Sequence, residues 1–248
     1  MVPGMPAVGE PAPLRRVGHK GADLIAPGNT LASFDAALAA GVDMIEFDVL
    51  TQRGTGRLVL AHDAGAARGG NPPTLEEGLA HLASAPFDGI ELDVDLKARG
   101  YEDRVVQALS EAGLVERALV SSQYPESLDR VRALEPALRL GWSVPRAASD
   151  YTATPGFRLP ALALLWLYAR ALPWLAARTL RARRWDAIMA HWRLVTPGLV
   201  EAVRSAGGQL YVWTVDDPAH IHRLAGMGVT GVITNDPRLF GSHAVTRA

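Results

Sequence analysis

Two histidines and a pair of acidic residues lie in the first quarter of the chain, at spacings that suit chemistry. His19 precedes Lys20, Glu46 and Asp48 are separated by one residue, and His62 follows soon after. Each group ends an apolar run typical of a β-strand. Carboxylates can hold a cation and imidazoles can move protons, so this set is typical of a site that couples a metal to acid–base catalysis.

A further set of ionisable residues lies along the expected strand 90–96 and just beyond its end. Asp93, Asp95 and Lys97 alternate at a spacing of two and therefore point to one side of the strand. Glu91 begins this strand, and we interpret it as structural. Burying several carboxylates without a cation is costly. Because the ligands are oxygens and the chain has no cysteine, the pattern favours Mg²⁺ or Ca²⁺ and phosphoryl chemistry.

These residues need a scaffold that brings the ends of several strands together. Apolar runs alternate with helical patterns along the chain, which predicts parallel strands joined by helices. Strands are expected at 15–19, 44–50, 58–61, 90–96, 118–121, 138–142, 187–190, 210–215 and 231–234. Helices are expected at 30–40, 74–83, 102–112, 125–134, 197–206 and 218–226. The predicted fold is an α/β protein, a (β/α)8 TIM barrel, whose active sites lie at the carboxyl ends of the strands. The competing open, doubly wound sheet lacks a glycine-rich phosphate motif after the first strand.

Composition is consistent with one barrel domain spanning residues 1–248. The net charge is −1 and hydrophobic residues make up 48%, so no nucleic-acid partner is expected. Residues 1–13 lack the apolar core of a signal peptide, so a cytoplasmic location is expected, peripheral to a membrane if some segment binds lipid. The oligomeric state is left open.

Residues 149–185 form an unusually long connection between the expected strands 138–142 and 187–190, which are the fifth and sixth of the barrel when the short run 58–61 is not counted. The stretch 156–185 has no acidic residue but six arginines, interleaved with leucine and tryptophan. We interpret it as an Arg-rich amphipathic insertion, too short in its uncharged part to span a membrane. Pro173 would break a single helix, so two short helices are expected. The segment is either a lid or lipid contact at 158–184, or a solvated arginine face packed on the barrel.

The same residues resemble a known family. Its similarity covers nearly the whole chain apart from the insertion and the termini, and is carried by four stretches: VGHKGADLIAPGNTLASFDAALAAGVDMIEFDVLTQRGTGRLVLAHD, IELDVDLK, LVSSQYPESL and YVWTVDDPAHIHRLAGMGVTGVITNDP. They are similar to the glycerophosphodiester phosphodiesterases. That resemblance implies a TIM barrel that uses a divalent metal to hydrolyse glycerophosphodiesters to glycerol 3-phosphate and an alcohol.

The resemblance also implies roles by position. The catalytic residues would be His19 and His62, the metal ligands Glu46, Asp48 and Asp95, and the substrate-binding residues Lys20, Lys97 and Trp213. One histidine would deprotonate the attacking hydroxyl, which could be the substrate's own glycerol hydroxyl, and the other would protonate the leaving alkoxide. We assign the base to His19 and the acid to His62, although the sequence does not separate the two.

Three positions depart from the family pattern. Lys20 replaces an arginine and loses its bidentate geometry toward phosphate, Gly28 replaces the glutamate of the PENT motif, and Asp95 replaces a longer glutamate ligand. Two alternatives therefore stay open: a lysophospholipase D-like phosphodiesterase acting on lipids, and a catalytically weak binding homologue. A metal-dependent aldolase or isomerase explains the two histidines poorly.

Overall fold

The protein is described by a computed structural model covering residues 13–146 and 158–241, with the side chains of 158–165 left aside. Its strands are β1 (Arg15–Gly18), β2 (Met44–Thr51), β3 (Leu58–Leu60), β4 (Glu91–Leu96), β5 (Ala118–Ser122), β6 (Arg139–Val144), β7 (Ala187–His191), β8 (Gln209–Trp213) and β9 (Gly231–Thr234). Its helices are α1 (Leu31–Ala39), α2 (Leu75–Leu82), α3 (Glu102–Glu111), α4 (Pro125–Leu134), α5 (Arg158–Arg181), α6 (Pro197–Ser205) and α7 (Pro218–Met227).

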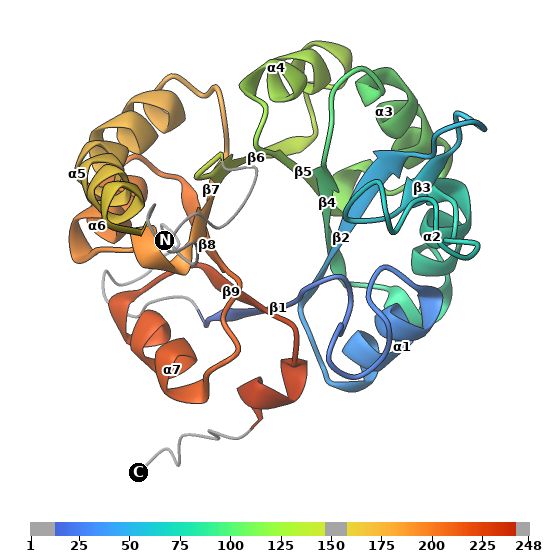
Figure 1. Ribbon diagram of the computed structural model, residues 1–248, viewed down its shortest axis with the longest axis horizontal. Helices are drawn as coiled ribbons and strands as arrows, with labels where there is room; N and C mark the ends of the chain where they lie inside the picture. The colour runs from blue at the N-terminus through green and yellow to red at the C-terminus, as the bar shows by residue number, and fades with distance from the viewer. Residues whose placement is uncertain (1–12, 147–157, 242–248) are drawn as a thin grey trace, which may run out of the picture.

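Eight of the strands close into a parallel barrel ringed by helices (Figure 1). The order runs β1-β9-β8-β7-β6-β5-β4-β2, and β1 pairs with β2 to complete the ring. The sequence-based prediction of a (β/α)8 TIM barrel is therefore confirmed. β3 is not a barrel strand, because it pairs antiparallel with the end of β2, with Val49 opposite Leu60. A three-residue apolar run carries no signal for the direction in which it pairs.

Alternation along each barrel strand separates two apolar regions. On β2, Ile45, Phe47 and Val49 point outward into the layer between strands and helices, since neighbouring side chains of a strand point to opposite faces. Met44 points inward and packs with Tyr211 and other buried residues at the centre of the barrel. This inner plug fills the lower barrel, so the polar inward positions of β2 and β4 lie above it, toward the carboxyl ends of the strands.

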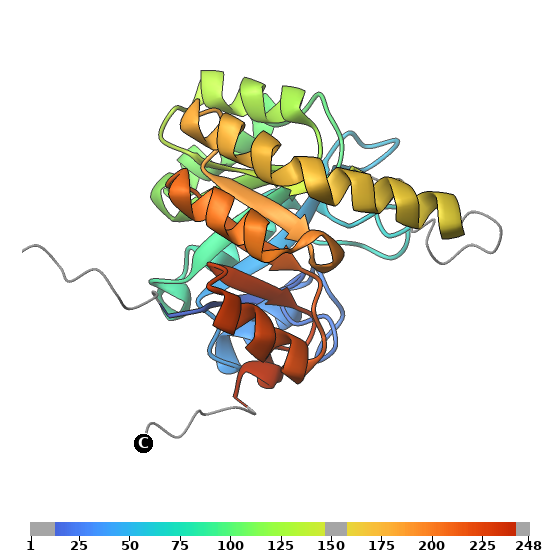
Figure 2. The ribbon, with the colours of Figure 1, turned by 90° about the vertical axis from the view of Figure 1, so that its left-hand side faces the viewer.

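The connection after β6 contains one continuous helix, α5, with Pro173 inside it. The expectation of two short helices is therefore wrong. Leu172 and Ala176, on either side of the proline, are fully buried in the core between α5, α6 and the barrel. Their packing holds both sides of Pro173 in one helix, although proline removes a backbone hydrogen bond. Figure 2 shows the N-terminal part of α5 extending past the end of the barrel.

Candidate active site

Along one of its two edges, β2 pairs first with β1 and near its end with β3. β1 pairs only with Met44 and Ile45, and β3 begins to pair only at Val49. In between, the carbonyl of Glu46 accepts from the N–H of Gly21 at 3.0 Å, and the carbonyl of Asp48 accepts from the N–H of Ala61 at 3.1 Å. The backbone of this stretch is therefore held by the segments that follow β1 and β3, which carry His19 and His62.

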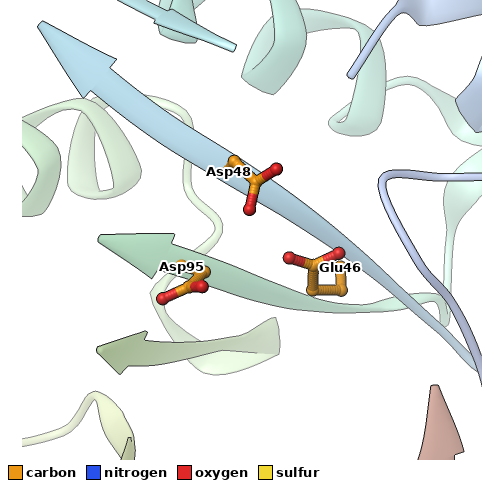
Figure 3. A group of neighbouring side chains, drawn as sticks. All are labelled: Glu46, Asp48 and Asp95. Carbon is orange, nitrogen blue, oxygen red and sulfur yellow. The ribbon is translucent and has the colours of Figure 1, made fainter. Parts of the chain in front are cut away.

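The side chains of Glu46, Asp48 and Asp95 form one acidic cluster at the upper end of the barrel. Glu46 and Asp48 come from β2 and Asp95 from β4, where Asp48 is the register partner of Asp95. Each offers an oxygen, and the three oxygens lie within 4.8 Å of one another. Figure 3 shows the three carboxylates on the same side of their two strands, facing a shared space.

Lys97 provides the positive charge nearest to this cluster. Its Nζ lies 2.6 Å from Asp48 Oδ1 and 2.5 Å from Asp95 Oδ2. Burial alone would lower the pKa of Lys97, but the surrounding carboxylates raise it well above its usual value. Lys97 is therefore a permanent cation between two of the three acidic side chains.

One ammonium does not balance the carboxylates of the site. Burial raises the pKa of Glu46 well above its usual value, and the charge of Asp48 adds to this effect. Burial likewise raises the pKa of Asp95 in spite of Lys97. Burial would also raise the pKa of Asp48, but Lys97 and the two histidines outweigh it and bring that pKa to about 2. The site therefore favours additional positive charge.

The donor set fits a hard divalent cation. All three candidate ligands are carboxylates, as Mg²⁺ and Ca²⁺ prefer. Asp95 Oδ1 is buried and has no hydrogen-bond partner, although buried polar atoms are nearly always paired. Asn29 orients Asp48 by donating to Oδ2 at 2.8 Å and accepting from the backbone N–H of Asp48 at 3.0 Å. This arrangement leaves Glu46 and Asp95 oxygens available to a cation.

His19 directly follows β1 and is fixed by the end of β9. Asn235 donates from Nδ2 to Asp216 Oδ2 at 2.6 Å, which turns its amide oxygen toward His19 Nδ1 at 2.5 Å. Nδ1 therefore carries the proton, and Nε2, 3.8 Å from Glu46 Oε2, holds the free lone pair. Burial lowers the pKa of His19 to about 4, and Lys20 and Lys97 act in the same direction. The imidazole is thus a neutral base at pH 7.

His62 stands at the rim of the same pocket, with half of its side chain exposed (51%). The pocket is lined by His19, Glu46, His62, Asp93, Asp95, Lys97, Ser121, Gln123, Ser143, Met189, Trp213, Thr214 and Ile233. Trp213 ends β8, and its indole N–H donates to the carbonyl of Met189 at 2.8 Å. Trp213 therefore presents a rigid aromatic wall to the pocket.

Lys20 is placed differently from the other predicted site residues. It is not among the residues that line the pocket, and its Nζ pairs with Asp23 Oδ2 at 3.3 Å. Its backbone N–H donates to Glu46 Oε2 at 2.7 Å, from a left-handed conformation with φ of 51°. Lys20 thus orients a candidate ligand through its backbone while its side chain is paired with Asp23.

Sequence reasoning missed two asparagines in this site. Asn29 orients Asp48, and Asn235 holds His19. Asn235 directly follows the last strand, β9. Its position at the carboxyl end of β9 was the available signal, because all such ends meet at one edge of the barrel. Glu91, in contrast, pairs with Arg15 and Arg139 at the opposite end of the strands, as its structural interpretation predicted.

A model of the glycerophosphoryl diester phosphodiesterase family matches residues 19–74 and 95–239. The chain belongs to this family. Its members are phosphoric diester hydrolases, and the chain is therefore an enzyme of that class. The matched residues include all eight predicted site residues, five of them in 19–74 and three in 95–239, where the match resumes at Asp95.

Full-length relatives and solved structures agree with this assignment. A glycerophosphodiester phosphodiesterase of Caldanaerobacter subterraneus subsp. tengcongensis is 26% identical, over 89% of this chain and 93% of its own length. A Bacillus subtilis glycerophosphodiester phosphodiesterase is 25% identical, over 90% and 84%. The structure of an Oleispira antarctica phosphodiesterase in complex with the product sn-glycerol-3-phosphate superposes with a TM-score of 0.67 at 20% identity, over 92% of this chain and 96% of that one. The last likeness shows the shared fold.

The structure describes helices in residues 13–146 and 158–241. Every helix in that part of the chain falls short of the length and apolarity needed to cross a bilayer.

Proposed function

We propose that this enzyme hydrolyses glycerophosphodiesters to glycerol 3-phosphate and an alcohol with the help of a divalent cation, Mg²⁺ or Ca²⁺. The observation that carries the proposal is the placement of a neutral, oriented His19 beside the cluster of Glu46, Asp48 and Asp95. Members of the family bind glycerophosphodiesters, and the Oleispira enzyme was solved with sn-glycerol-3-phosphate.

In the proposed site, Glu46, Asp48 and Asp95 would hold the cation. A bound divalent cation neutralises negative charge on the phosphate oxygens and makes the phosphorus easier to attack. The ammonium group of Lys97 lies between the carboxylates of Asp48 and Asp95 and reduces the repulsion between them. Lys97 also lines the pocket, where its positive charge attracts the phosphate. Trp213 supplies an apolar wall for the glycerol carbons.

His19 and His62 move the protons. Nε2 of His19 accepts the proton of the attacking hydroxyl, and Asn235 stabilises the imidazolium that results by holding the Nδ1 proton. If the glycerol hydroxyl attacks, the P–O bond to the alcohol breaks, a cyclic phosphate forms, and water then opens it to glycerol 3-phosphate. His62, exposed at the rim, donates a proton to the leaving alkoxide and recovers one from solvent. Both residues line the same pocket, so a phosphodiester can lie between them.

Glycerol 3-phosphate release from a panel of glycerophosphodiesters, followed with and without EDTA, tests the proposal. We expect release from at least one diester and its loss when EDTA removes the cation. The protein is not the proposed enzyme if no diester is cleaved, and the metal requirement is wrong if cleavage survives EDTA. A lysophospholipid in the panel tests the lipid-directed alternative, which the exposed tryptophans of α5 favour.

A further inference from the structure

We propose that the outer face of α5, whose N-terminal part lies at the same end of the barrel as the loop after β1, docks on an anionic lipid bilayer. Six large apolar side chains stay exposed in the part of the chain that the structure describes, and five of them lie in these two segments. They are Leu24, Ile25, Trp166, Leu167 and Trp174, with exposed fractions of 39 to 62%. Exposed large apolar side chains gathered in so few segments indicate a contact site.

The exposed residues of α5 form a stripe on the face away from the barrel. Trp166, Arg170, Trp174 and Arg178 recur every four residues and all are exposed. Leu172 is fully buried against the barrel and lies two residues from Trp174, about 200° away around the helix axis. The helix thus has one face packed on the protein and one unpartnered face of tryptophan and arginine.

The charge of this stripe has no acidic counter-charge among the described residues. Arg170 stacks on Trp166 at 4.9 Å and Arg178 on Trp174 at 5.3 Å. Among the described residues these two arginines have no carboxylate partner, whereas Arg130 and Arg204 each form an ion pair. No acidic residue occurs between 156 and 185. A positive surface with interleaved tryptophans is complementary to anionic headgroups above an acyl boundary.

The position of the stripe relative to the pocket supports this occupant. Figure 2 shows the N-terminal part of α5 projecting past the carboxyl ends of the barrel strands. Leu24 and Ile25 follow β1 and therefore lie at the same end of the barrel. Trp166, near the N-terminal end of α5, therefore lies toward the end of the barrel that carries the pocket. Delivery of membrane-derived diesters to the pocket is a benefit that rests on the proposed function, whereas docking itself does not.

Co-sedimentation with phosphatidylcholine vesicles, with and without phosphatidylglycerol, tests the docking. We expect binding to the anionic vesicles at low salt that weakens as salt rises. Arg181, an exposed residue at the end of α5, extends the stripe by one more arginine. Replacing Arg170, Arg178 and Arg181 together by glutamine should lower the partition coefficient on the order of 100-fold. Trp166→Ser with Trp174→Ser should also release the protein. The matched controls are Arg204→Gln and Leu134→Ser, exposed side chains outside both segments, which should bind like the wild type.

The outcomes separate docking from catalysis. All α5 variants should hydrolyse a water-soluble diester at the wild-type rate, because none of the replaced residues lines the pocket. No binding to anionic vesicles at low salt, or equal binding by the α5 and control variants, overturns the proposal. The proposal is also overturned if the protein does not bind vesicles but forms a dimer that the α5 variants dissociate. Vesicle binding without hydrolysis of any diester would support docking and refute the proposed function instead.

Discussion

Asp23 and Gly28 are joined by a hydrogen bond of 2.9 Å from the backbone N–H of Gly28 to Oδ1 of Asp23. A Cβ at position 28 would lie 2.5 Å from that oxygen and 2.9 Å from Cβ of Lys20. Asp23 therefore fills the space next to Lys20 that a side chain at position 28 would need. The loop that lacks the family's glutamate has a carboxylate from Asp23 instead.

This relationship predicts that Gly28→Glu alone is harmful. The new side chain must displace Asp23 and Lys20, and overpacking of this kind costs about 1 to 3 kcal/mol of stability. Adding Asp23→Ala should restore much of the loss, because it removes the obstructing carboxylate. A double-mutant cycle on the unfolding free energy and on KM measures the coupling. Additive effects of the two changes would show that the two positions do not share one space.

Removing either histidine should reduce turnover. With metal saturating, His19→Ala and His62→Ala are each expected to lower kcat by about 10²-fold or more, the usual effect of a positioned acid or base. Asn235→Ala should lower kcat less, because it removes the partner of His19 and leaves the imidazole in place. His81→Ala, which removes an imidazole paired with Asp35 outside the pocket, is the control. A near-wild-type rate for either site variant would refute its assigned role.

Asp95 should control the affinity for the cation. We expect Asp95→Asn to raise the half-activating metal concentration by about tenfold or more, since it weakens one of three ligands. The rise in Tm on adding metal should shrink in the same variant, because that rise reports binding to the folded state. Asp103→Asn, an exposed carboxylate paired with Arg130, should change neither value. Unchanged metal dependence in Asp95→Asn would remove Asp95 from the ligand set.

Glu91 should matter for stability and not for turnover. Burial would raise its pKa, but Arg15 and Arg139 outweigh it and lower that pKa below the usual value. Glu91→Gln is expected to lower the unfolding free energy at pH 7 by about 1 to 2 kcal/mol and to leave kcat unchanged.

The pH dependence of this effect has a definite sign. A depressed pKa in the folded state stabilises the protein above the unfolded pKa, and the contribution disappears as pH falls through the folded value. The difference between wild type and Glu91→Gln should therefore be full at neutral pH and vanish in acid. Denaturant unfolding at several pH values measures it, and a difference that persists below both pKa values would contradict the ion-pair explanation.

The barrel and the grouping of the acidic residues could be predicted because both depend on short-range patterns. The alternation of strands and helices sets the topology, and the spacing of two between Glu46 and Asp48 sets their common face. Asp95 lies beside Glu46 and Asp48 because β4 pairs with β2. The family resemblance assigned the same three residues as metal ligands.

Interactions across long sequence separations were not predictable in the same way. Asn235 contacts His19 from the other end of the chain, and the hydrophobic periodicity of the sequence does not predict such a pair. Asp23 competes with the substrate role assigned to Lys20, since one acidic neighbour three residues away redirects a flexible ammonium. Pro173 was given its usual helix-breaking weight, but burial of the residues around it outweighed one missing hydrogen bond.

His19 and His62 are positioned by different parts of the fold, because His62 follows the antiparallel strand β3. His19 directly follows the barrel strand β1. His62 follows the antiparallel hairpin of β2 and β3, whose turn spans residues 52–57. A hairpin strand inverts its side chains when its register slips by one residue. A change of one residue in that turn would therefore move His62, the proposed acid, away from the pocket while the barrel and the acidic cluster stay intact. Evolution of this enzyme can thus tune or silence its chemistry through the length of a surface turn.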